Sequence, residues 1–144
     1  MNAPRLLDAG EAALVVEFGQ RVDPSVNDRV LALDDALRAD PPAGLRECVP
    51  TYRSLMIHYD PLVLDRDVLA GHVLGLADGA AERVAAPTRW ILPCCYDAPY
   101  GEDLAAVADL IGRAPAEVAA LHAAATYRVY MFGFSPGFAY CGGL

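Results

Sequence analysis

The stretch "DPSVNDRVLALDDALRADPPAG", residues 23–44, decides the fold class of the N-terminal part of the chain. Asp23 is a residue type that caps helices with its side chain, and Pro24 suits the first helical position, where a backbone N–H has no helical partner in any case. Apolar residues recur at helical spacing until "ADPPAG" stops the pattern, namely Val26, Val30, Leu33 and Leu37. The stretch therefore predicts a helix over about 24–39.

Strand patterns lie on both sides of this helix. Before it, the turn "DAGE" is followed by a strand pattern over residues 13–18, in which Leu14, Val16 and Phe18 alternate with Ala13, Val15 and Glu17. A short strand is expected before this turn, at residues 5–8. After it, residues 45–49 and 53–59 are two further strand candidates, and "DP" ends the second. The helix is therefore expected to stand between two pairs of strands.

A second helix is expected from about Asp65, with an inner stripe of Leu69, Val73 and Leu76. The order strand, strand, helix, strand, strand, helix predicts a small antiparallel sheet covered on one face by two helices, which is an α+β fold. The small, polar, proline-ended stretch "ADGAAERVAAP" then predicts a domain boundary at about residue 86. Residues 1–86 are thus expected to form an N-terminal α+β domain.

Residues 87–144 predict a second and smaller set of elements. "TRWILPCCY", residues 88–96, is expected to be a strand, followed by a helix that Gly112 ends and another that Pro115 opens. The strand "TYRVYMFGF", residues 126–134, then leads into a turn-rich loop. Two strands leave sheet edges with unpaired backbone groups, which proteins normally cover, so we expect this second domain to be incomplete.

Composition and charge limit the classes of function. The 144 residues are 55% hydrophobic and 21% charged, as in globular proteins, and the net charge of −8 opposes binding to nucleic acid. The apolar runs are far shorter than the roughly 20 residues of a membrane span, and an acidic residue interrupts the N-terminus where a signal peptide would be apolar. We therefore expect a cytoplasmic protein that binds neither nucleic acid nor a membrane.

Metal and disulfide sites are not indicated by the spacing of the ligand residues. No cysteine stands in a C-x-x-C pattern, so free thiols are expected at Cys48, Cys94, Cys95 and Cys141. No second histidine or carboxylate stands at metal-ligand spacing around His58, His72 or His122. The sequence therefore predicts neither a metal site nor a bound cofactor.

The pentapeptide "GFSPG", residues 133–137, has the G-x-S-x-G spelling of the nucleophile elbow of serine hydrolases. An elbow needs a helix directly after the serine and a backbone N–H on the next residue to bind the oxyanion. Pro136 follows Ser135 and has no N–H, and the glycines that come after it oppose a helix. We therefore predict that Ser135 is not a nucleophile, and no catalytic residue is assigned.

Aromatic side chains gather around this pentapeptide, at Tyr130, Phe132, Phe134, Phe138 and Tyr140. Exposed aromatic surface is costly unless something docks on it, so the loop is predicted to shape a pocket or an interface; packing of alternate rings in a core is the other interpretation. The candidate residues for substrate binding or a subunit interface are these rings together with His122, Ser135, Pro136, Gly137, Gly142 and Gly143.

Two further positions have open interpretations. His122 falls on the apolar side of its predicted helix with Val118 and Ala125, where it is either a hydrogen-bonded histidine of the core or of a subunit interface, or a group for substrate binding or proton transfer. Tyr52 and Arg53 stand at the start of a predicted strand, where they have either a turn role or a contact to the second domain.

Three blocks of this sequence resemble a known family: "DAGEAALVVEFG", "PTYRSLMIHYDP" and above all "LHAAATYRVYMFGFSPGFAYCGGL". They are similar to the proteins called allophanate hydrolase subunit 1, the 5-oxoprolinase B subunit or KipI. The resemblance implies an N-terminal domain followed by a cyclophilin-like β-barrel, with "GFSPGFAYCGGL" early in the barrel. Residues 87–144 would then be the start of a truncated cyclophilin-like domain.

The same resemblance implies two classes of function. One is a non-autonomous subunit of an ATP-dependent 5-oxoprolinase, which opens 5-oxoproline to glutamate, or of an allophanate hydrolase or urea carboxylase-like complex. Its partners would be the homologous C subunit, also called allophanate hydrolase subunit 2, and the A subunit, with ATP used by the assembled complex. The other is a KipI-type inhibitor of histidine kinase autophosphorylation. The sequence does not separate the two classes, and we expect the isolated chain to be inactive.

Overall fold

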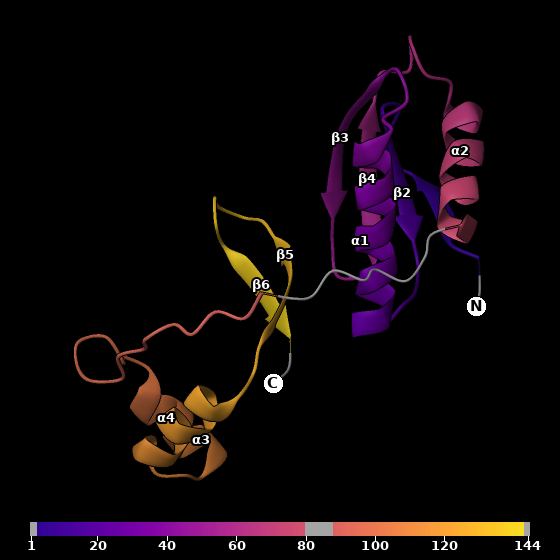
Figure 1. The fold of residues 1–144 in the computed structure, drawn as a ribbon. Coiled ribbons are helices and arrows are strands. Elements are labelled where there is room, and N and C mark those ends of the chain that lie inside the picture. The colour runs from indigo at the N-terminus through magenta and orange to yellow at the C-terminus, as the bar shows by residue number, and fades with distance from the viewer. Residues whose placement is uncertain (1–2, 80–87, 143–144) are drawn as a thin grey trace. The chain divides into compact units, whose positions relative to one another are not determined.

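The computed structural model describes residues 3–79 and 88–142 (Figure 1). Residue contacts divide the chain into two compact units. The first unit combines the N-terminal residues with Val129–Gly142, and the second unit contains the segment between them. The predicted boundary at residue 86 lies outside the described residues.

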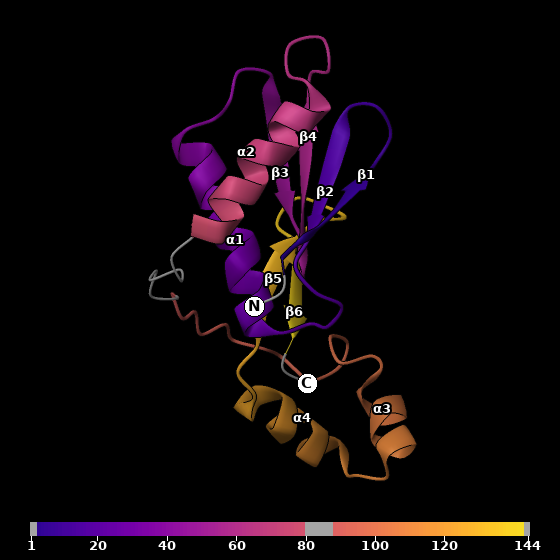
Figure 2. The same cartoon turned by 90° about the vertical axis from the view of Figure 1, so that its right-hand side faces the viewer.

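The first unit is built on a four-stranded sheet (Figure 2). Its strands are β1 (Arg5–Asp8), β2 (Ala13–Glu17), β3 (Leu45–Pro50) and β4 (Ser54–Tyr59). They stand in the order β1-β2-β4-β3, and every neighbouring pair is antiparallel. Because β2 and β3 are each antiparallel to β4, they run in the same direction, and the chain between them crosses over β4. The predicted antiparallel α+β architecture is confirmed.

Two helices of this unit begin where the sequence predicts. α1 (Pro24–Ala39) is capped by Asp23, whose carboxylate accepts a hydrogen bond of 2.8 Å from the backbone N–H of Ser25. α2 (Arg66–Gly79) follows Asp65, whose carboxylate accepts a bond of 2.8 Å from the N–H of Asp67. Each cap satisfies a backbone donor that the first helical turn leaves unpaired.

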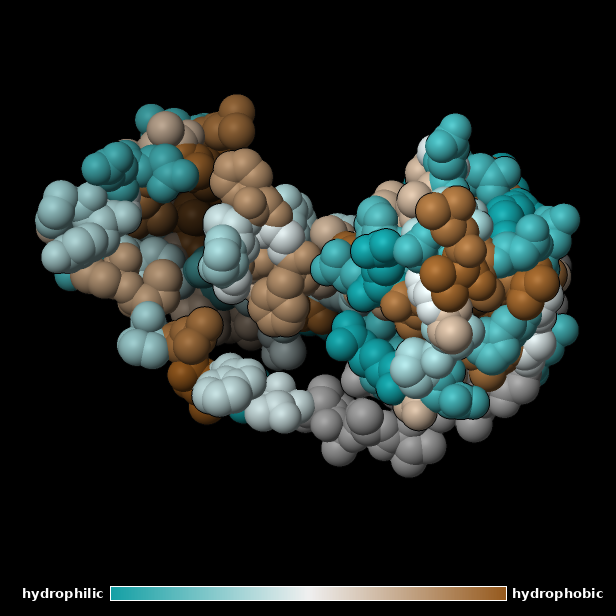
Figure 3. Space-filling model, turned by 90° about the horizontal axis from the view of Figure 1, so that it is seen from above, coloured by the Kyte–Doolittle hydropathy of each residue, from teal (hydrophilic) through white to brown (hydrophobic). Residues whose placement is uncertain are grey.

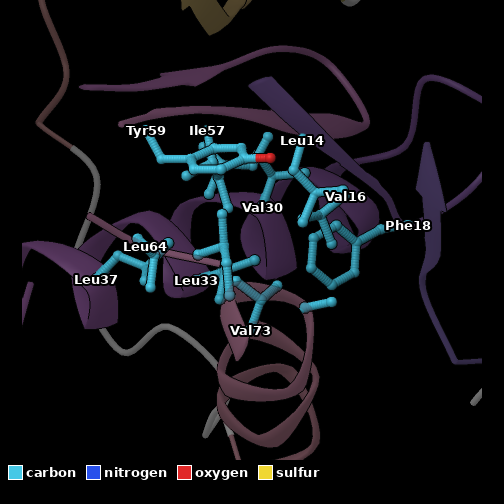
Figure 4. Packing of buried hydrophobic residues seen from close by; sticks show 13 residues of the cluster. Leu14, Val16, Phe18, Val30, Leu33, Leu37, Ile57, Tyr59, Leu64 and Val73 are labelled. Atoms are coloured by element: carbon cyan, nitrogen blue, oxygen red, sulfur yellow. The ribbon is translucent and has the colours of Figure 1, made fainter. Parts of the chain in front are cut away.

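The core of the first unit lies between these helices and one face of the sheet (Figure 4). Leu14 of β2 and Ile57 of β4 are fully buried and point toward Leu33 of α1 and Val73 of α2, which are also fully buried. Alternate residues of β2 and β4 supply the inner face, as the period of two in the sequence predicts. This core joins α1 and α2 to the sheet.

The second unit contains α3 (Leu104–Ile111) and α4 (Pro115–Ala124). Gly112 ends α3 in the left-handed conformation with φ of 66°, so that the N–H of Arg113 reaches the carbonyl of Ala108 at 2.9 Å. Both helix boundaries were predicted. None of the helices among the described residues is long and apolar enough to cross a membrane.

The prediction of a strand over residues 88–96 is wrong. The structure has no regular secondary structure there, and Trp90, Ile91 and Leu92 are largely exposed. The residue types favour a strand, but a strand also needs a neighbour whose backbone groups pair with it, and no described strand pairs with this segment.

The predicted turn-rich loop at the C-terminal end contains a strand of its own. β5 (Arg128–Phe132) and β6 (Ala139–Gly142) form a two-stranded sheet. Residues 133–138 connect the two strands, so the segment is a hairpin. It belongs by its contacts to the first unit, although the second unit separates it from the other strands in the sequence.

Candidate functional site

The turn between β5 and β6 determines how the aromatic side chains are presented. The N–H of Phe138 donates to the carbonyl of Ser135 at 3.0 Å, with Pro136 and Gly137 between them. Gly137 has φ of 78°, which a type II turn requires at its third position, and proline suits the second. The letters "SPG" therefore encode a type II turn. Ser135 is exposed at its first position, and none of the described histidines bonds to its hydroxyl.

Phe134, directly before this turn, has a strained backbone. Its φ is 61°, and the N–H of Ser135 donates to the carbonyl of Gly133 at 2.7 Å, which closes a γ-turn around it. Left-handed backbone at a bulky residue is an outlier that costs about 1–3 kcal/mol. The Phe134 side chain is nevertheless 93% exposed, so burial of the ring does not offset the strain.

Five aromatic rings contact one another in sequence along the hairpin and the adjacent turn, and we call them the aromatic row. The centroids of Phe134 and Phe138 are 5.9 Å apart, those of Phe138 and Tyr140 5.2 Å, those of Tyr140 and Tyr52 6.5 Å, and those of Tyr52 and Tyr130 5.1 Å. Such distances suit tilted and edge-to-face aromatic pairs. The row therefore runs from an exposed end at Phe134 to a buried end at Tyr130.

The two interpretations of the aromatic residues therefore hold for different rings. Tyr130 is packed in the first unit, whereas Phe132, Phe134 and Phe138 are exposed. Hydrophobic surface, brown in Figure 3, is visible among the hydrophilic atoms. Gly142 lies against Tyr130, because a Cβ on this glycine would come within 2.7 Å of the tyrosine ring. Gly143 lies outside the described residues.

Two side chains of the N-terminal segment anchor the hairpin. Asn27 of α1 is fully buried, and its Nδ2 donates to the carbonyl of Thr51 at 3.1 Å and to that of Tyr130 at 3.4 Å. The hydroxyl of Tyr52 donates to the carbonyl of Cys141 at 3.0 Å. Tyr52 thus contacts the range 87–144 that was predicted as the second domain, although the structure groups Cys141 with the first unit. Arg53 bonds to Glu17 and to the carbonyl of Gly19.

Asn27 was not among the predicted site residues. Its signal in the sequence is a polar residue three positions before Val30, on the side of α1 that faces inward. A buried amide must find hydrogen-bond partners, and those of Asn27 come from two distant parts of the chain. A search for polar residues on the apolar stripe of a helix would have identified it.

His122 lies in the second unit and is exposed, so its placement in a core is wrong. None of the described residues of α4 is buried, although several are apolar. Helical periodicity shows which side chains share a face and does not show what covers that face. The hydrogen-bonded part of the expectation is confirmed, because Nδ1 of His122 lies 2.6 Å from the hydroxyl of Tyr96.

The His122 ring also contacts a second tyrosine. The ring of Tyr127 lies 5.3 Å away from it and that of Tyr96 5.7 Å away, centroid to centroid. The Tyr127 hydroxyl donates to the backbone carbonyl of His122 at 3.2 Å. Burial raises the pKa of the Tyr96 phenol, and its interaction with Cys94 raises it further. The imidazole is thus held on the surface by two tyrosines.

The cysteines are free thiols, as predicted, and differ in exposure. Cys94, Cys95 and Cys141 are exposed, whereas Cys48 is half-buried and burial raises its pKa to about 11. No group of three histidine, cysteine or acidic side chains among the described residues is placed to hold a metal ion.

Alkylation tests this difference in reactivity. A rise in pKa from the ordinary 9.0 to about 11 lowers the thiolate fraction roughly 100-fold, and the thiolate is the reactive form. We expect iodoacetamide at about pH 8 to label Cys48 last, as followed by peptide mass spectrometry. Unfolding in denaturant should remove the difference, and labelling of native Cys48 at the rate of Cys141 would contradict it.

The comparisons with known proteins agree with this architecture. Residues 4–144 match the model of the carboxyltransferase domain, subdomain C and D. The chain belongs to this family. The resemblance found in the sequence is thereby confirmed. One relative, the 5-oxoprolinase B subunit of Bacillus subtilis (strain 168), is 31% identical over 146 residues, which cover 94% of this chain and 61% of that protein.

Another relative has the same name. The 5-oxoprolinase B subunit of Escherichia coli O157:H7 is 30% identical over 146 residues, which cover 100% of this chain and 65% of that protein. The chain therefore spans less than two thirds of the length of these two relatives.

Solved structures show the carboxyltransferase-type fold. The crystal structure of TTHA0988 matches with a TM-score of 0.74 and 39% identity, over 90% of this chain and 25% of that chain. The urea amidolyase of K. lactis matches with a TM-score of 0.65 over 96% of this chain and 10% of that chain. At 15% identity, this match shows a similar fold and nothing more.

Proposed function

We propose that this chain is a non-autonomous subunit of an ATP-dependent complex that opens 5-oxoproline to glutamate. Its partners are the homologous C subunit, also called allophanate hydrolase subunit 2, and the A subunit; the assembled complex uses ATP in the cytoplasm, while this chain binds no cofactor itself. Two relatives named as the B subunit of 5-oxoprolinase support the assignment. The structural observation that supports a role as a subunit is Phe134, a strained and 93% exposed aromatic residue at the free end of an anchored row.

A docking role fits the chemistry of the aromatic row. Phenylalanine and tyrosine rings offer large contact area at a low entropic cost, and aromatic residues are enriched at the centres of protein interfaces. The buried end of the row is fixed by the bonds of Asn27 and Tyr52. The exposed end at Phe134 and Phe138 is therefore presented on a firm base, as an interface anchor requires.

We also propose that residues 88–142 belong to a cyclophilin-like barrel, with β5 and β6 among its strands. Trp90, Ile91 and Leu92 expose apolar side chains in a segment without regular secondary structure, and further barrel elements would cover them. The β5–β6 hairpin supports it as well, because a two-stranded sheet is marginal by itself and gains from further strands.

A reconstitution assay tests the enzymatic proposal. The purified chain is incubated with 5-oxoproline and ATP, alone and with the A and C subunits, and glutamate and phosphate are measured. We expect turnover only when the three proteins are present. Mixtures that omit one protein are the controls. Turnover by the isolated chain, or none by the full mixture, would refute the proposal.

The same preparations separate the other functions implied by the family. Parallel mixtures with allophanate or urea in place of 5-oxoproline test the related hydrolase and carboxylase activities. An autophosphorylation assay of a purified histidine kinase tests KipI-type inhibition. We expect no effect on the kinase, and a stoichiometric loss of label would replace the enzymatic proposal by a regulatory one.

A further inference from the structure

The His122 side chain is fixed although it is exposed. Exposed side chains normally exchange between rotamers. Here the ring stands between the rings of Tyr96 and Tyr127, and Nδ1 is bonded to the Tyr96 hydroxyl at 2.6 Å. Holding a side chain in one rotamer costs conformational entropy, and contact with water alone does not compensate for this cost. The arrangement positions the other ring nitrogen, Nε2.

The Tyr96–His122 bond joins the phenol oxygen to Nδ1 at 2.6 Å, which is a close hydrogen bond. An imidazole nitrogen donates in one tautomer and accepts in the other, so this bond is linked to the position of the ring hydrogen. Burial raises the pKa of Tyr96, so its phenol keeps the proton that it donates. When this phenol donates to Nδ1, the hydrogen of a neutral imidazole resides on Nε2.

Stabilisation of the helix end does not account for this bond. The Tyr127 hydroxyl already satisfies the backbone carbonyl of His122 at the last turn of α4. The Tyr96 hydroxyl pairs with the imidazole and also interacts with the Cys94 side chain. Among the described residues, the side-chain hydrogen bond of the ring is made by Nδ1, so Nε2 is open to a ligand.

We propose that the Tyr96 hydroxyl donates to Nδ1 of His122 and that Nε2–H then binds a carbonyl or carboxylate oxygen of a small-molecule substrate, with Tyr96 and Tyr127 as positioning residues. The class of ligand follows from the donor, because a neutral N–H in a fixed direction selects an oxygen acceptor. The choice of 5-oxoproline as the specific ligand, which carries both a carbonyl and a carboxylate, rests on the proposed function.

The first experiment needs no enzymatic activity. Nitrogen-15 spectra of the isolated chain report the imidazole tautomer of His122, and titration with 5-oxoproline, then acetate, reports ligand contact at Nε2. We expect the Nε2–H tautomer, and a shift of that resonance with 5-oxoproline. The Tyr96→Phe variant should show a tautomer mixture. A predominant Nδ1–H tautomer in the unchanged chain, or no shift at saturating 5-oxoproline, would overturn the proposal.

The second experiment uses the assembled complex. His122→Ala should raise the KM for 5-oxoproline about 10–100-fold, as for loss of a hydrogen bond to a charged group. Leu121→Ala, on the same helix and 54% exposed, is the control and should leave KM unchanged. An unchanged KM in a fully assembled His122→Ala complex would overturn this site and leave the proposed function standing. An inactive unmutated complex would refute only the function, because the spectra test the site separately.

Discussion

Replacement of Asn27 by aspartate is expected to lower the free energy of unfolding of the first unit by about 3–5 kcal/mol. The amide is fully buried and donates to the carbonyls of Thr51 and Tyr130. A carboxylate of the same shape would place negative charge against those two oxygens and remove the donor. Such a buried charge without a partner is among the most destabilising changes that one substitution can cause.

Denaturant unfolding followed by far-UV circular dichroism measures this effect. Gln20→Glu is the matched control, since it changes an amide to a carboxylate at an exposed position and should alter stability by less than about 0.5 kcal/mol. Acid should narrow the difference between Asn27→Asp and the unchanged chain, because the protonated carboxyl regains a donor. Equal stability of the two proteins at neutral pH would show that Asn27 does not anchor the hairpin.

Replacement of Phe134 by glycine should move stability and partner binding in opposite directions. Glycine adopts the φ of 61° without strain, so the fold should gain up to about 1 kcal/mol. The loss of a central aromatic contact should weaken binding to the C subunit about 10–100-fold, the range of interface hot spots. This opposition is expected only if the strained ring is retained for docking.

The alanine variant separates the two effects. Phe134→Ala also removes the ring but keeps a side chain in the left-handed region, so it should lose affinity without the gain in stability. Thermal unfolding and isothermal titration calorimetry against the C subunit measure the two quantities. An unchanged affinity of Phe134→Gly would remove the docking role of the aromatic row.

The elements of the first unit follow from local signals in the sequence. Asp23 and Asp65 cap α1 and α2 as their residue types predict, and alternation locates β2 and β4. Here cap chemistry, periodicity and burial indicate the same structure, so local information is sufficient.

Prediction fails where structure depends on distant parts of the chain. The sequence predicts a strand over 88–96, where the structure has none, and a loop where it has β6. In both places residue types indicate propensity, whereas the strand itself is defined by pairing with a neighbour. Asn27 was missed for a related reason, since its partners lie far along the sequence.

The sequence predicts which residue types form the candidate site, but only part of how these residues contact one another. Aromatic residues at a glycine-rich turn are visible in the sequence, and so is the type II turn chemistry of Pro136 and Gly137. The sequence does not show that Tyr52 joins the aromatic row or that Tyr96 pairs with His122. The residues in these contacts belong to different segments, so no helical or strand periodicity in the sequence links them.

The discontinuous composition of the first unit has a consequence for synthesis on the ribosome. Asn27 and Tyr130 are 103 positions apart, so the amide emerges long before its second partner. At about 5–20 residues per second, the nascent chain waits roughly 5–20 s with this polar group and the face of Tyr52 uncovered. During that interval Val129–Gly142 have not yet been made, so the first unit can be completed only after the second unit has been synthesised.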